Sequence, residues 1–336
     1  MPPPTEAPVP VGADVPLRRP GAGRAVAVLV LVAVAALIPL LGPRAALEGT
    51  GEAAAPGVGV IALLRTVLFA ALCVQAGEVF GRFLARRVDP LREPPATWSA
   101  YVPWAGFAAA LGLASVVASG NLIPHSMAAL DIGGLGGTRD GMLALVEVNG
   151  FLFAGLCART RRPATALAPL SAVAVAEALR AHPAAEDTAL LGSGLTLIHL
   201  TCAALWVGGL VYVLRTTHAW RTSAPEAGTA LLGRYARVAA LLLAAITATG
   251  VCSTLRRMPP GTVVDQLTTT AYGRALLAKV LLVAVVAGLA LAARLRLRRA
   301  EGRERAYAPA RAEVVVLAVV VAVSAALTAL PVPIRW

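Results

Sequence analysis

The sequence has little of what disulfide-bonded proteins, zinc proteins and most enzymes require. Its four cysteines lie far apart, with no CxxC pair, so neither a disulfide framework nor a cysteine-only zinc site is indicated. The motifs GxSxG, HExxH and GxxxxGK(S/T), typical of nucleophilic, zinc-dependent and nucleotide-binding enzymes, are absent. We therefore expect a protein that is not an enzyme.

Lysine and acidic residues are also scarce. Of the 30 basic residues 29 are arginine, against 18 acidic ones, which gives a formal net charge of +12. The arginines stand between long apolar runs, so their charge is expected to set orientation in a membrane and not to bind nucleic acid. Hydrophobic residues make up 58% of the chain and the mean hydropathy is +0.74, far above what a soluble core needs. The composition predicts an all-α, polytopic helix bundle in the lipid bilayer.

Nine apolar segments follow a proline-rich N-terminal stretch, residues 1–24, which we expect to be a disordered cytoplasmic tail. A helix needs about 20 residues to cross a bilayer. The first segment has no clear small-residue cleavage site at its end, so we interpret it as an anchor and not as a signal peptide. The predicted spans are 25–42, 58–81, 99–119, 141–158, 164–180, 190–214, 238–255, 271–293 and 312–330.

The arginines also predict the orientation, because cytoplasmic loops collect Lys and Arg. With nine spans, one side of the membrane holds 21 arginines, including Arg18, Arg19 and Arg24 of the tail, and the other side holds eight. This asymmetry predicts a multi-pass membrane protein of nine spans with a cytoplasmic N-terminus and an outer C-terminus. The weakest point is the loop after the seventh span, where Arg256 and Arg257 fall on the outer side.

The run HLTCAALWVGGLVYVL in the sixth span carries chemistry-bearing side chains inside an apolar segment. His199, Cys202 and Trp206 are three and four residues apart, so they share one helix face. Ionisable groups at this depth are costly and often mark a pathway or ligand site. If His199 binds a metal, Cys202 is the natural second donor. The alternative is that His199 only hydrogen-bonds a neighbouring helix while Cys202 packs.

Four further candidate metal ligands fall in predicted outer loops: His125, Met127, His182 and Met258. Thioether and thiolate groups favour Cu(I), and imidazole serves Cu(I) or Cu(II), so this collection is suited to copper. The spacing is sparse, and solvated loop side chains are the alternative.

Lys279, the only lysine of the chain, lies inside the eighth span. It either snorkels outward or needs a partner, for which Glu147 and Glu177 are the candidates in the outer half of the membrane. Such a pair would be structural or would line a polar route.

The C-terminal half, roughly residues 182–331, resembles the CopD family of copper-resistance membrane proteins. The resemblance rests on IHLTCAALWVGGL, YARVAALLLAAITATG, TTTAYGRALLAKVLLV and RAEVVVLAVVVAVSAALTALP. It implies a CopD-like membrane region over residues 181–336 behind an N-terminal membrane region over 25–180. It also implies copper movement across the membrane in partnership with periplasmic copper-binding proteins. The family pattern falls on His182, His199, Trp206, Gly208, Gly250, Tyr272, Gly273, Arg274, Lys279 and Glu313.

Together these features predict copper import from the outer side. The outer histidines and methionines would collect the ion, and His199 with Cys202 would relay it past a lining formed by Lys279, Arg274 and Glu147. One alternative is a haem-binding or redox membrane protein, although a bis-histidine haem needs two ligands and only His199 lies clearly inside a span. The other is an assembly factor that loads copper into cytochrome oxidase.

Overall fold

The computed structural model describes residues 22–93, 95–126, 128, 130–160, 162–184, 186, 188–298 and 303–332. Within these ranges every regular element is helical. The elements are α1 (Ala22–Leu47), α2 (Val58–Arg86), α3 (Val102–Ala118), α4 (Ile132–Leu135), α5 (Arg139–Ala158), the 3-10 turn η2 (Pro163–Ala166), α6 (Leu167–Arg180), α7 (Ala189–Ala219), α8 (Pro225–Arg257), α9 (Val263–Thr269), α10 (Ala271–Arg298) and α11 (Arg303–Leu327).

The chain divides into two compact units, Met1–Val34 and Ala35–Trp336. In the first unit, the described residues form the beginning of α1. Most of the tail expected over residues 1–24 lies outside the described residues, and residues 22–24 open α1. The second unit contains the remaining helices. The boundary expected between the two membrane regions at residue 181 stays a prediction.

Each predicted apolar segment overlaps one helix, although α6 has only 14 residues and several helix ends differ from the prediction. α8 begins at Pro225, well before the apolar segment, because proline lacks an N–H and suits the first turn of a helix. α6 begins only at Leu167 because Pro163 opens a separate 3-10 turn. The short helices α4 and α9 lie in loops and were not predicted.

Five helices are long and apolar enough to cross a membrane, judged by length and composition: Val58–Arg86, Arg139–Ala158, Ala189–Ala219, Pro225–Arg257 and Ala271–Ala292. Shorter apolar helices are Ala35–Leu47, Val102–Ala118 and Ala312–Leu327. The fold is therefore the all-α membrane bundle that the composition predicts. The count of nine spans stays a prediction.

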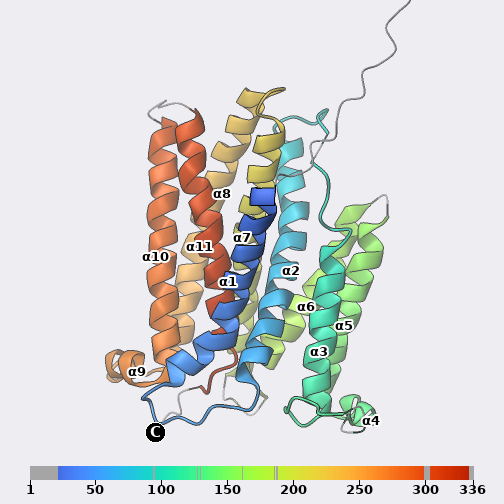
Figure 1. The fold of residues 1–336 in the computed structure, drawn as a ribbon, viewed down its shortest axis with the longest axis vertical. Helices are drawn as coiled ribbons and strands as arrows, with labels where there is room; N and C mark the ends of the chain where they lie inside the picture. The colour runs from blue at the N-terminus through green and yellow to red at the C-terminus, as the bar shows by residue number, and fades with distance from the viewer. Residues whose placement is uncertain are drawn as a thin grey trace, which may run out of the picture. The chain divides into compact units, whose positions relative to one another are not determined.

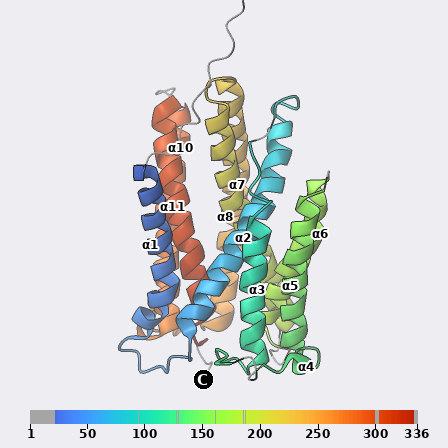
Figure 2. The same cartoon turned by 45° about the vertical axis from the view of Figure 1, so that its right-hand side comes forward.

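Helix α2 joins the two sides of the second unit. It packs against α3 and α7, which lie on different sides of it (Figure 1). Further pairs are α3 with α5, α5 with α6, α7 with α8 and α10 with α11, so neighbours in sequence are mostly neighbours in space (Figure 2). The short helices α4 and α9 lie at the same end of this unit (Figure 1).

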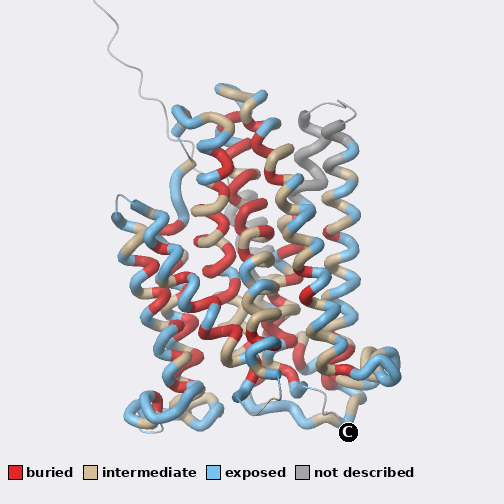
Figure 3. Tube along the Cα trace, turned by 180° about the vertical axis from the view of Figure 1, so that it is seen from behind, coloured by how far each residue is buried: buried red, intermediate tan, exposed pale blue. Residues whose placement is uncertain are grey.

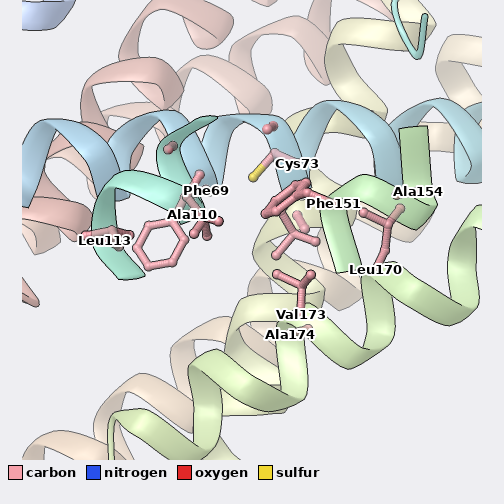
Figure 4. Close-up of a cluster of buried hydrophobic side chains, with 14 of the residues drawn as sticks. Phe69, Cys73, Ala110, Leu113, Phe151, Ala154, Leu170, Val173 and Ala174 are labelled. Atoms are coloured by element: carbon pink, nitrogen blue, oxygen red, sulfur yellow. The ribbon is translucent and has the colours of Figure 1, made fainter. Parts of the chain in front are cut away.

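A cluster of buried side chains holds α2, α3, α5 and α6 together. It includes Phe69, Leu113, Phe151 and Val173, which pack around the buried Cys73 (Figure 4). A second cluster joins α2, α7, α8 and α11 around Trp206 and its neighbours. Buried residues follow the inner helix faces, whereas loops and outward faces are exposed (Figure 3). Exposed apolar residues on these outward faces suit contact with lipid.

Candidate functional site

His199 lies on α7 and faces α8. Its Nδ1 is 3.0 Å from the hydroxyl oxygen of Thr249, and that hydroxyl donates to the carbonyl oxygen of Ala245 at 2.7 Å. Because the threonine proton is used in this way, we assign the bridging proton to Nδ1 of the histidine. The Nε2 atom then carries the lone pair, and the hydrogen bonds of the imidazole go to Thr249 and to the backbone of Ile246 on α8. An imidazole that is fixed through one nitrogen and carries its lone pair on the other is the arrangement found in metal-ligating histidines.

A glycine of α8 lies beside the ring of His199. A Cβ atom built at Gly250 would lie 3.6 Å from Cε1 of His199, an ordinary van der Waals contact. The glycine therefore leaves the imidazole edge less crowded than any larger residue would.

Polar residues continue along α7 on both sides of His199. Ser193, Thr196, His199, Cys202 and Trp206 follow one another at intervals of three or four residues, so each lies beside the next on the helix. Cys202 packs against the cluster that contains Trp206, while the hydroxyl of Ser193 is buried without a partner. On α7, Cys202 therefore lies one turn and Trp206 two turns beyond His199.

Lys279 lies on α10, and its positive charge acts on the imidazole of His199. No hydrogen-bond acceptor for its ammonium group occurs among the described residues. The expected pairing with Glu147 is not formed. Glu147 lies on α5 and pairs instead with Arg180 of α6, with 2.7 Å between Nη1 and Oε2.

His182 lies before α7 and contacts this helix one turn before His199. Its Nε2 is 3.0 Å from the hydroxyl of Thr196, which precedes His199 by three residues, or about 4.5 Å along the axis. Its Nδ1 donates to Glu186 at 2.7 Å. Both ring nitrogens are therefore engaged, and His182 would coordinate copper only by releasing one of them.

Glu186 connects the His182 loop to α8. The carboxylate accepts from His182 and, at 2.9 Å, from Arg256. Partial burial would raise the pKa of Glu186, but the hydrogen bond from His182 and the charges of His182, Arg256 and Arg257 outweigh it and lower the pKa. The network holds the beginning of α7 against the end of α8.

The other predicted outer residues do not gather around this loop. Met258 is fully buried in a cluster with Leu47 and Tyr272, because its apolar side chain fills the space between helix ends, so its thioether does not face solvent as a loop position suggested. His125 is exposed, and Met127 lies outside the described residues. These positions do not form a metal site with His182 in the structure.

The remaining family-pattern residues have local structural contacts. Arg257 lies over the Tyr272 ring, 5.7 Å from its centroid. Arg274 donates to the carbonyl oxygens of Thr268 and Glu48, at 2.8 and 2.6 Å, and so ties loops together.

Glu313 is buried on α11, where its charge acts on Tyr235. The Tyr235 hydroxyl donates to the Trp206 carbonyl. Glu313 therefore belongs to the packing around Trp206 on the far side of the row from His182.

Sequence reasoning missed Thr249, Glu186 and Arg180. The spacing of His182 and Glu186, one helical turn apart, was a local signal for their contact. Thr249 gave none, because fifty residues separate it from His199. Among the described residues, no group of three or more His, Cys, Asp or Glu side chains is positioned to hold a metal ion.

Residues 229–327 match the family model described as copper resistance protein D. The match covers most of α8 together with α9, α10 and α11, and it begins after His199 and the rest of α7. No curated protein and no solved structure matches the chain. Residues 229–327 are therefore a region similar to the copper resistance protein D (CopD) family, and this match supports the resemblance seen in the sequence.

Proposed function

We propose that this protein moves copper inward across the plasma membrane along the polar row of α7, without catalysing a reaction. The observation that carries the proposal is the hydrogen bond between Nδ1 of His199 and Thr249, which leaves the lone pair on Nε2, the atom that would bind an ion. Neutral imidazole can ligate either oxidation state of copper, and Cys202, one turn further on, supplies a soft donor. Copper is the cargo of this site.

A site with few donors suits transport. Conduction needs binding that is favourable enough for entry and weak enough for exit. The charge of Lys279 repels a cation at His199, which would shorten the residence of the ion. This arrangement favours relay over storage.

The outer end of α7 suits the entrance. His182 holds Thr196 one turn before His199, and the Glu186 network fixes the surrounding loop. A periplasmic copper-binding protein would deliver the ion at this end. Arg256 would then keep α7 and α8 in register during delivery.

The proposal is tested by cellular copper content. Cells without the gene, cells with it and cells with His199→Ala are compared at equal external copper, with His218→Ala as a control at the other end of α7. We expect the intact gene and the control to raise copper, and His199→Ala to return it to the level of cells without the gene. Equal copper in all strains would overturn the transport proposal. Loss of cytochrome oxidase activity at unchanged copper would indicate the assembly-factor alternative.

Thr249→Val is expected to lower copper affinity by about 10–100-fold, the range for losing a residue that orients a metal-ligating histidine. Valine keeps the shape of threonine but cannot accept from Nδ1. The measurement is competition for copper between purified protein and a chelator. Thr254→Val is the control, because Thr254 lies on the same helix and donates only to the carbonyl of Gly250. Equal losses in both variants would contradict an orienting role for Thr249.

A further inference from the structure

Two buried carboxylates lie on α5 and α6, outside the segment that matches the family. Glu147 on α5 has no exposed surface, and Glu177 on α6 is 5% exposed. These two helices pack against each other, and the charge of Glu177 acts directly on Glu147. The proposed copper path uses neither residue.

The two carboxylates have too few hydrogen-bond donors around them for all of their oxygens. Arg180 donates to Oε2 of Glu147 at 2.7 Å, but Oε1 of Glu147 and Oε1 of Glu177 are both buried without a partner. A buried acceptor without a donor destabilises the fold, and more so when it is charged. The two carboxylates together therefore need at least one more donor.

Glu78 of α2 shows what a fully satisfied buried carboxylate looks like in the same protein. It accepts from the hydroxyl of Thr97 at 2.8 Å, from the backbone N–H groups of Trp98 and Ser99 at 2.8 and 3.0 Å, from the Ser99 hydroxyl, and from Arg215 at 2.9 Å. Such a set of donors stabilises the ionised form. Nothing comparable surrounds Glu147 and Glu177.

The neighbouring charges do not replace the missing donor. Arg180 of α6 and Arg65 of α2 act on Glu147, and Asp140 of α5 acts in turn on Arg180. Arg65 makes no hydrogen bond to either carboxylate, and its own Nε is buried without a partner. Two adjacent carboxylates in a site of low polarity are most stable when they share one proton.

We propose that Glu147 and Glu177 bind one proton between them and form a proton-binding site inside the membrane bundle. The proton forms an O–H bond on one Oε1, and that hydroxyl donates to the carboxylate of the other residue. Arg180 holds the remaining negative charge. Nothing is oxidised or reduced, and the proton comes from water.

Infrared spectroscopy of the full-length protein in lipid nanodiscs tests the proposal. A protonated carboxyl group has a C=O stretch that is separate from the carboxylate bands and shifts in heavy water. At neutral pH we expect this band in the wild type and its loss in Glu147→Gln and in Glu177→Gln, because the remaining carboxylate then ionises beside Arg180. Glu78→Gln is the matched control and should keep the band.

Circular dichroism and size-exclusion profiles show whether each variant is folded. If a single variant does not fold, titration of the wild type decides the question. The band should persist at pH values where ordinary glutamates are ionised and disappear at higher pH. A wild type without the band at neutral pH, or a band that persists in both folded variants, would overturn the proposal. The readout needs no copper, so it is independent of the proposed transport.

Discussion

Glu78→Ala is expected to destabilise the protein by about 3–5 kcal/mol, the usual effect of removing one partner from a buried ion pair. Glu78 is 2% exposed and organises the connection between α2 and α3. Its loss leaves Arg215 of α7 without its carboxylate and leaves the backbone donors of Trp98 and Ser99 without an acceptor. The α2–α3 loop and the end of α7 should therefore loosen together.

Arg215 would keep part of its environment after this substitution. It lies 3.8 Å from the centroid of the Trp98 ring and donates to the carbonyl of Ala96. These contacts do not neutralise its charge, so they do not offset the loss. Thermal unfolding in detergent, followed by circular dichroism, measures the effect. Glu93→Ala, an exposed carboxylate in the same loop, is the control, and equal midpoints for the two variants would contradict the stabilising role of Glu78.

Gly208→Ala is the second change with a large expected effect. A Cβ atom at Gly208 would overlap the backbone carbonyl oxygen of Cys73 and lie 3.0 Å from Cα of Gly77, so α2 and α7 would have to separate. Small residues permit this kind of close approach between membrane helices. Overpacking a core usually costs about 1–3 kcal/mol, and a clash with backbone, which cannot rotate away, belongs at or above the upper end.

The same helix provides the control for this prediction. A Cβ atom at Gly194 on α7 would meet nothing within 4 Å, so Gly194→Ala should leave stability unchanged or raise it slightly through better helix propensity. The stability of the two variants is compared by measuring the fraction of each that remains monodisperse after heating in detergent. Similar stability of Gly208→Ala and the wild type would show that the α2–α7 contact is not tight.

The long helices could be predicted from the sequence because a bilayer requires about 20 apolar residues per span. Their ends could not, since Pro225 and the 3-10 turn at Pro163 depend on local backbone geometry outside the apolar runs. The short helix α9 carries only a few apolar residues, too few for a periodic pattern to be recognised.

Only the site residues that stand out in the local sequence could be predicted. His199 stands out as a histidine within an apolar segment, and Cys202 follows at helical spacing. The contact of His199 with Thr249 depends on which faces of α7 and α8 meet, and no local sequence pattern determines those faces. For the same reason the sequence could not decide whether Lys279 pairs with Glu147 or Glu177 or extends outward, because α5 packs on α3 and α6 while α10 packs mainly on α11.

The copper content of purified protein tests the central claim most directly. Wild type, His199→Ala and His218→Ala are equilibrated with copper under reducing and under oxidising conditions, freed of unbound metal, and analysed by mass spectrometry of the element. If His199 is the relay ligand, the wild type and His218→Ala retain copper in at least one condition and His199→Ala loses most of it. Equal copper in His199→Ala and the wild type would contradict the assignment of His199 as a copper ligand.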